Sequence, residues 1–188
     1  MTTDDTGIRI GPEDDTIAFL LLFENGLHSY VLARASAHAG YPSSTLLLSQ
    51  QAVEFLIKAI RRLENEKPEP VHDLVRLIEE TKRPIPQKVK DLVAHEPTRQ
   101  FLQALSDAYL APRYAERRLD LTLDNLRRHL DRIVSVLREA YTEKVKFQKK
   151  PKLYVPAWLR DAVLDGNAYF TVDDLTTDPL ALLMPGSQ

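Results

Sequence analysis

The sequence has no cysteine and only six glycines among its 188 residues. Without cysteine, disulfide bridges and thiolate metal sites are excluded, and the fold must rest on packing alone. No apolar run reaches the roughly 20 residues that a membrane-spanning helix needs. The first fifteen residues are polar and acidic, whereas a secretory signal is basic and then apolar. We therefore expect a cytoplasmic protein that does not contact a membrane.

Several catalytic and cofactor motifs are also missing. The few glycines form no Gly-rich phosphate loop, and no serine has the flanking glycines of a nucleophile elbow. His95 and Glu96 are followed by Pro97 and lack the second histidine of a zinc-protease helix. We expect neither a metal nor a cofactor.

The net charge of −2 conceals an uneven distribution. Residues 1–15 carry one base and five acids, residues 113–152 carry twelve bases and six acids, and residues 153–188 carry one base and five acids. The basic block could meet phosphates or an acidic partner, or it could be the solvated face of a helix. The acidic ends of the chain could equally fold over it.

Apolar residues recur at spacings of three and four along most of the chain, which predicts helices. Gly40 follows the first helix as a stop, and Ser43 and Ser44 are placed to cap the second. Beyond Pro151 a short amphipathic segment containing Trp158 runs to Gly166, and an acidic stretch with scattered prolines follows. The expected helices are 16–39, a second from the turn at 41–44 to about 63, 72–82, 87–94, one from about 97 to Pro112, and 121–147.

These patterns predict an all-α protein, an up-and-down helical bundle of four to five main helices with a short helical, partly extended C-terminal arm. The expected organisation is an acidic N-terminal tail over residues 1–15, the bundle over 16–150 and the arm over 151–188. The second helix also bears a polar stripe of Gln51, Glu54, Lys58 and Arg62. Glu54 and Lys58 have the spacing of a surface pair, so the stripe is either a solvated seam or the wall of a groove.

Three stretches in order along the chain resemble the HEPN (higher eukaryotes and prokaryotes nucleotide-binding) family. They are Leu48–Ala59 with its glutamine, glutamate and Lys-Ala pair, Val71–Leu74 with its His-Asp-Leu helix start, and Asp107–Tyr114 with a tyrosine followed by Arg-Tyr. The resemblance covers roughly residues 16–147. It implies a small helical bundle that is usually a homodimer.

The family divides into two functional groups, and the resemblance points to the second. In the first group, ribonucleases, an arginine precedes a histidine by four to six intervening residues, the arginine holding the phosphate and the histidine handling a proton. None of the five histidines here has such an arginine; the nearest pairs are Arg34 with His38 and Arg128 with His129. The second group lacks the pair and accompanies minimal nucleotidyltransferases. The chain departs from the family's pattern at Ala115 and in the segment after Pro151.

The resemblance implies a groove that binds nucleotide or substrate. An arginine fork suits phosphate, and tyrosine rings can stack on a base. The alternatives are that Arg113 binds carbonyls at a helix end, that the tyrosines finish the core and that His72 with Asp73 only caps a helix. The candidate residues are Gln51, Glu54, Lys58, His72, Tyr109, Arg113 and Tyr114.

We accordingly expect a homodimer that pairs through its first and last helices and binds a nucleotide or RNA without catalysing a reaction. A separate minimal nucleotidyltransferase is the expected partner, as in a toxin–antitoxin pair. Two alternatives stay open at this point. One is a metal-independent ribonuclease that uses Arg34 and His38, and the other is a protein–protein interaction module with no nucleotide ligand.

Overall fold

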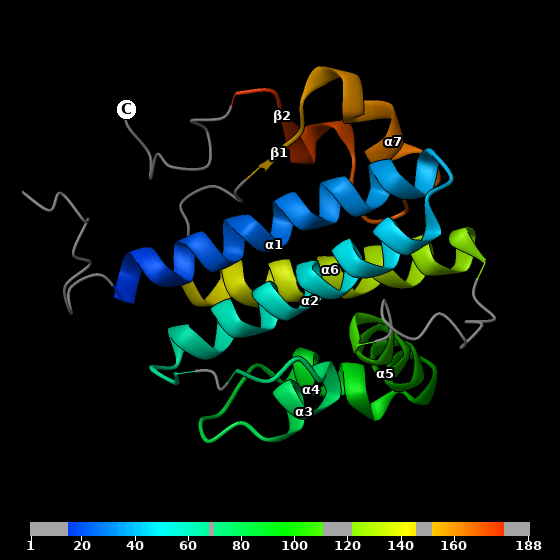
Figure 1. Cartoon of the computed structure of the whole chain (residues 1–188). Helices are drawn as coiled ribbons and strands as arrows, with labels where there is room; N and C mark the ends of the chain where they lie inside the picture. Colours follow the sequence, from blue (N-terminus) through cyan, green and yellow to red (C-terminus); the bar gives the residue numbers. More distant parts are fainter. Residues whose placement is uncertain (1–14, 68–69, 111–121, 146–151, 179–188) are drawn as a thin grey trace, which may run out of the picture.

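Three long helices lie side by side and form the centre of the molecule (Figure 1). They are α1 (Asp15–His38), α2 (Pro42–Leu63) and α6 (Leu123–Val145). The computed structural model describes residues 15–67, 70–110, 122–145 and 152–178. Within these ranges the expected all-α bundle is confirmed, and the long helices begin and end within two residues of the predicted positions. None of the described helices is long and apolar enough to span a membrane.

α1 is apolar around most of its circumference because it packs on two sides. One side contacts α2 and α6, and the other contacts the C-terminal arm. Gly26 lies at a close approach of α1 to α2: a Cβ there would be 2.7 Å from Cγ of Leu56. Leu21 and Leu32 remain exposed on the face that neither neighbour covers. Gly40 ends the hairpin turn with a φ of +78°, a conformation that favours glycine.

The second helix begins earlier than the predicted serine cap. Tyr41 is the N-cap and Pro42 takes the first helical position, where its missing N–H costs nothing. Ser43 and Ser44 are therefore already inside the first turn, and no side chain caps the helix. The prediction that the serines cap α2 was wrong, because the proline starts the helix before them.

Three shorter helices cover one side of the long ones. α3 (Leu74–Glu79), α4 (Gln87–Ala94) and α5 (Glu96–Leu110) lie together there; α3 and α5 contact α2, and α4 packs on α6. Asp73 caps α3 by accepting a hydrogen bond of 3.0 Å from the backbone N–H of Arg76. Ser106 of α5 accepts a hydrogen bond of 2.9 Å from the buried N–H of Leu74, which fixes the start of α3 against α5.

α6 has a different polarity on its two long faces. Its inner face joins the core, where the ring of Tyr141 stacks on Phe23 with centroids 3.8 Å apart. In the first half of its outer face Arg128 and Arg132 are exposed. In the second half Glu139 and Glu143 form ion pairs with Lys88 of α4.

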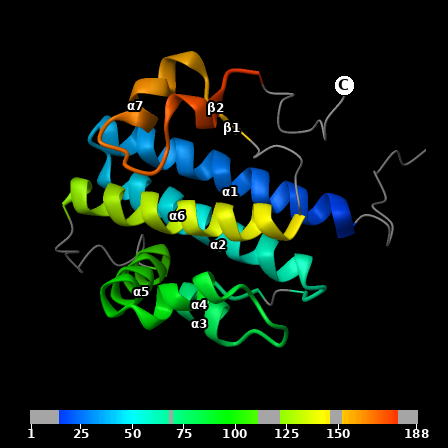
Figure 2. The ribbon, with the colours of Figure 1, turned by 180° about the vertical axis from the view of Figure 1, so that it is seen from behind.

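The C-terminal arm lies on the side of α1 opposite the shorter helices (Figures 1 and 2). It contains β1 (Leu153–Tyr154), the 3₁₀ turn η3 (Ala157–Leu159), α7 (Arg160–Leu164), the 3₁₀ turn η4 (Val172–Asp174) and β2 (Leu175–Thr176). The two strands pair in parallel, with Leu153 opposite Leu175. Apolar side chains of the arm, including Val163 and Phe170, belong to the main core.

Acidic residues of the arm bind basic residues of α6, as the charge distribution allowed. Asp165 accepts a hydrogen bond of 3.0 Å from Arg127, and Asp174 accepts one of 2.9 Å from Arg138. Part of the predicted basic block is thus neutralised by the arm, and part of it is a solvated face.

Candidate functional site

Two of the predicted site residues, Lys58 and His72, contact the carboxylate of a third, Glu54. Lys58, one turn further along α2, donates a hydrogen bond to Oε1 of Glu54. The Nδ1 atom of His72, just before α3, lies 3.1 Å from Oε2 of the same carboxylate. Gln50, one turn earlier on α2, donates a hydrogen bond from Nε2 to Oε2. We call Gln50, Glu54, Lys58 and His72 the Glu54 cluster.

The Glu54 cluster is a buried charge with a partly exposed rim. Glu54 is 5% exposed, whereas the side chain of His72 is 43% exposed. Burial alone would raise the pKa of Glu54, but hydrogen bonds from Lys58, His72 and Gln50 outweigh it and the pKa lies below its usual value. The carboxylate therefore stays ionised at neutral pH and holds Lys58 and His72 in place.

The interpretation of the polar stripe as a solvated seam was wrong for Glu54. α3 and the residues before it cover this part of α2, so that Glu54 lies inside the protein rather than on a surface. Gln50, and not the predicted Gln51, completes the cluster. Gln50 lies one turn before Glu54 on the same face, while Gln51 is rotated by about 100° and is only half-buried.

The remaining predicted residues cannot be placed in the cluster. Arg113 and Tyr114 lie outside the described residues, and of Tyr109 only the helical backbone of α5 is described. His72 contacts Glu54, and its neighbour Asp73 performs the predicted capping of α3. The capping interpretation is therefore confirmed for Asp73, and a binding role of His72 stays a prediction.

A second polar centre, which the sequence patterns did not indicate, joins α1 and α6 to the arm. Arg34 of α1 is 1% exposed and donates a hydrogen bond of 3.2 Å to Oδ2 of Asp131 on α6. Its other terminal nitrogen donates to the carbonyls of Val163, at 3.0 Å, and of Asp165 in the arm. Tyr30 donates to Oδ1 of Asp131 at 2.9 Å.

Asn167 of the arm completes this network. Its Nδ2 donates hydrogen bonds to the hydroxyl of Tyr30, at 2.7 Å, and to the carbonyl of Val163, at 3.0 Å. Burial raises the pKa of Asp131 to about 6, although Arg34 and the Tyr30 hydroxyl act in the opposite direction. The network thus fixes the arm on the bundle at the cost of a buried carboxylate.

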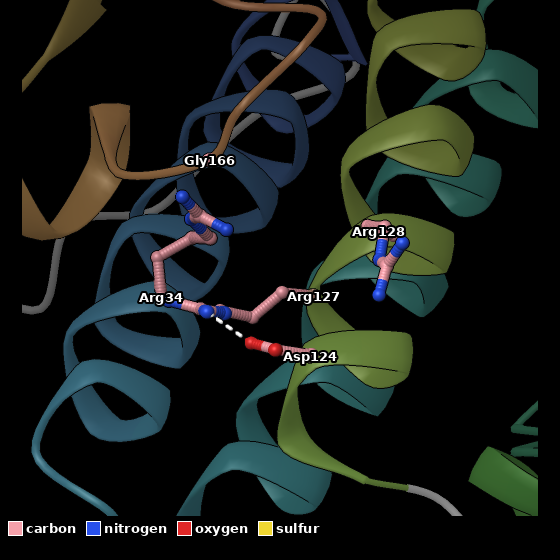
Figure 3. A pocket seen from close by; sticks show the side chains of 5 residues that line it. All are labelled: Arg34, Asp124, Arg127, Arg128 and Gly166. Atoms are coloured by element: carbon pink, nitrogen blue, oxygen red, sulfur yellow. Dashed lines mark hydrogen bonds and ion pairs between the residues drawn. The ribbon is translucent and has the colours of Figure 1, made fainter.

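A hollow of about 270 Å³ opens beside this network, between α1, the start of α6 and the arm. Arg34, Asp124, Arg127, Arg128 and Gly166 line it (Figure 3). Arg34 projects from α1 and Arg127 from α6, and Gly166 follows α7 at the arm's edge of the hollow. Arg127 also donates a hydrogen bond to Asp124.

In each of the two nearest arginine–histidine pairs, at least one member is engaged by other residues of the protein. Both terminal nitrogens of Arg34 are engaged by Asp131 and the arm, and His38 lies beside Asp165, with 3.7 Å between Nδ1 and Oδ2. Arg128 is exposed to solvent, whereas the adjacent His129 stacks on Phe101 of α5. Burial, together with nearby Arg132, lowers the pKa of His129, which favours its neutral form.

Metal ligation has no obvious place in the described part of the chain. No three histidine, aspartate or glutamate side chains among those residues come together in a group that could hold an ion. The Glu54 cluster and the arginine-lined hollow both bring charged side chains together without such a group.

Comparison with protein families gives one match. The family model described as the HEPN domain matches residues 20–145 of the chain. This segment contains α2, the Glu54 cluster and α6, and it ends before the arm. Comparisons with curated proteins and with solved structures gave no match.

Proposed function

Because the chain belongs to the HEPN family, we propose that it is a nucleotide- or nucleic-acid-binding helical module that binds through the Glu54 cluster without catalysing a reaction itself. The family assignment supports a nucleotide- or RNA-binding bundle. The sequence lacks the arginine–histidine spacing of the ribonuclease group, and Arg34 of the nearest pair is engaged inside the protein.

The observation that carries the proposal is the buried, ionised carboxylate of Glu54. Removing a carboxylate from water is costly, and replacing such a charge by an apolar residue is often neutral or stabilising. Its position therefore favours a role beyond stability. Here the carboxylate fixes the amine of Lys58 and the ring of His72 side by side. The partly exposed histidine ring offers a polar face to a phosphate or a base.

The partners that we propose are those expected for the second functional group of the family, which lacks the arginine–histidine pair. A chain without the ribonuclease pair is expected to act with a separate minimal nucleotidyltransferase. A homodimer through the first and last helices remains part of the proposal. The exposure of Leu21 and Leu32 on α1, at 45% and 47%, favours α1 as an interface because large apolar side chains there lack cover.

The proposal is tested by measuring the affinity of the full chain for a panel of nucleotides and short RNAs, with cleavage scored in EDTA. Lys58→Met removes one cation of the cluster, and His72→Gln removes the exposed ring without burying a new group. Loss of a charge-assisted contact should weaken binding on the order of tenfold in each variant. Lys90→Met, a change at an exposed lysine of α4, is the matched control and should bind like the wild type.

The outcomes separate the three functional hypotheses. Binding that weakens in both cluster variants but not in the control supports the proposal. RNA cleavage that persists in EDTA and disappears in His38→Ala would establish the ribonuclease alternative instead. If the wild type retains neither nucleotide nor RNA, the nucleotide proposal fails and the interaction module with no nucleotide ligand takes its place.

A further inference from the structure

Arginines outnumber carboxylates among the residues that line the hollow, although Asp131 and Asp165 also pair with Arg34 and Arg127. Three of its five lining residues are arginines and one, Asp124, is a carboxylate. The hollow lies at the first turns of α6, where the helix dipole adds a partial positive charge. An anion entering it would therefore meet a favourable field.

Two donor groups of the lining arginines have no hydrogen-bond partner among the described residues. Arg128 makes no hydrogen bond or ion pair with any of the described residues. The Nε atom of Arg34 is buried and likewise finds no hydrogen-bond partner there, although the two terminal nitrogens of this guanidinium are engaged. Arg128 is exposed and can contact an anion directly, whereas the buried Nε atom of Arg34 can act on an anion only through its charge.

We propose that this hollow binds a phosphate monoester, with Arg128 as its principal ligand and Arg127 and Arg34 in support. A phosphate monoester is close to a dianion at neutral pH and offers three acceptor oxygens, which match the planar donor fork of a guanidinium. The volume of about 270 Å³ lies just below the usual range for small-molecule pockets. It suits one phosphate group with a small part of its carrier.

Carboxylates that already bind the lining arginines determine the affinity that we expect for phosphate. Arg127 already binds Asp124 and Asp165, which the phosphate must partly replace. Arg128 forms no hydrogen bond or ion pair with a described carboxylate, and only the charge of Asp124 acts on it from a greater distance. We therefore expect moderate affinity that falls as salt screens the exposed charges, and a large share of the binding should depend on Arg128.

This site is distinct from the Glu54 cluster and includes a wall that the family match does not cover. The hollow lies between the bundle and the arm, whereas the Glu54 cluster lies where α2 meets the start of α3. The arm and α3 lie on opposite sides of the long helices (Figures 1 and 2). Gly166 lies beyond residue 145, where the match ends. Arm docking is thus what completes the site.

The test is calorimetric titration of the full chain at low salt with inorganic phosphate, 5′-AMP and adenosine. A terminally phosphorylated short RNA and its 5′-hydroxyl counterpart distinguish a mononucleotide from an RNA end as the source of the phosphate. Arg128→Met should weaken binding of inorganic phosphate on the order of tenfold. Arg132→Met is the matched control, because Arg132 lies one turn further on the same exposed face and does not line the hollow.

The expected pattern is binding of phosphate and 5′-AMP that depends on Arg128 and not on Arg132. Equal losses of phosphate affinity in the two variants would show a diffuse basic surface and overturn the proposal. A wild-type protein that does not bind inorganic phosphate would also overturn it. Lys58→Met separates this site from the Glu54 cluster. Binding of inorganic phosphate should survive that change even if the proposed nucleotide site is lost.

Discussion

The carboxyl group of Asp131 should make the protein less stable as the pH rises from about 4 to about 6. Two effects oppose each other at this residue: burial favours the neutral acid, and Arg34, 3.2 Å away, favours the carboxylate. The pKa of about 6 in the folded protein, against 3.8 for an ordinary aspartate, means that burial wins. The folded state therefore holds its proton over a pH range in which the unfolded chain has already lost it.

The sign and size follow from linkage. A state that binds more protons is weakened as the pH rises, so the stabilising contribution is complete below about pH 4 and is lost as the pH passes through about 6. The displacement of the pKa from 3.8 to about 6 corresponds to a loss of about 3 kcal/mol. Since Asp131 is only 1% exposed, solvent screening reduces this value little.

The measurement is urea denaturation followed by circular dichroism at several pH values, for the wild type and Asp131→Asn. Helical signal is the better probe because Trp158 is 79% exposed in the folded protein. The stability of the wild type relative to the variant should fall across this pH range. A relative stability that is constant or rises with pH would show that pairing with Arg34 dominates, and our reasoning would be wrong. Direct titration of the Asp131 carboxyl carbon by NMR gives the same answer without a variant.

Two further predictions concern packing and a buried hydrogen bond. Gly26→Ala should destabilise the protein by about 1–3 kcal/mol in urea denaturation, even though alanine favours helix, because its Cβ would lie 2.7 Å from Cγ of Leu56. Asn25→Ala, at the exposed neighbouring position, should leave stability unchanged or raise it by up to about 0.7 kcal/mol, because only helix propensity changes there. A Gly26 variant that is no less stable than the Asn25 variant would show that α1 shifts to make room. Ser106→Ala should cost about 1–3 kcal/mol, because it leaves the buried N–H of Leu74 without its acceptor. Faster hydrogen exchange at Leu74 should accompany the loss, and unchanged exchange would argue against this role.

Local sequence patterns were sufficient to predict the helices and the cap of α3. The spacing of apolar residues located the helices because each packs one or more apolar faces on its neighbours. Asp73 was recognisable as a cap because a capping side chain acts within three residues of its own position. The second helix shows the limit of such rules: Pro42 and the two serines are both good starting signals, and the proline prevailed.

The site could be predicted only in part, because burial depends on what packs against a face. The spacing of Glu54 and Lys58 is the same for a surface pair and for a covered one. Only the placement of α3 decides between them. A step of one residue along a helix rotates the side chain by about 100°. For this reason Gln50 contacts Glu54, whereas the predicted residue was Gln51.

Contacts between distant parts of the chain could not be recognised from local sequence patterns. Arg34 and Asp131 are separated by 97 positions, and neither belongs to a motif that would connect them. The two strands of the arm are two residues long, too short to show alternating polarity. The arginine-lined hollow combines residues from α1, α6 and the arm, so the basic charge of residues 113–152 indicated its chemistry but not its location.

The two-sided packing of α1 also has a consequence for the order of synthesis. Asn167 follows Tyr30 by 137 positions, so a ribosome completes α1 long before it makes the segment that covers that helix's second side. Until the arm emerges, the nascent chain exposes an apolar surface with Arg34 and Tyr30 within it. That surface is a natural substrate for chaperones that hold unfinished proteins, and an mRNA truncated before the arm would leave it permanently uncovered.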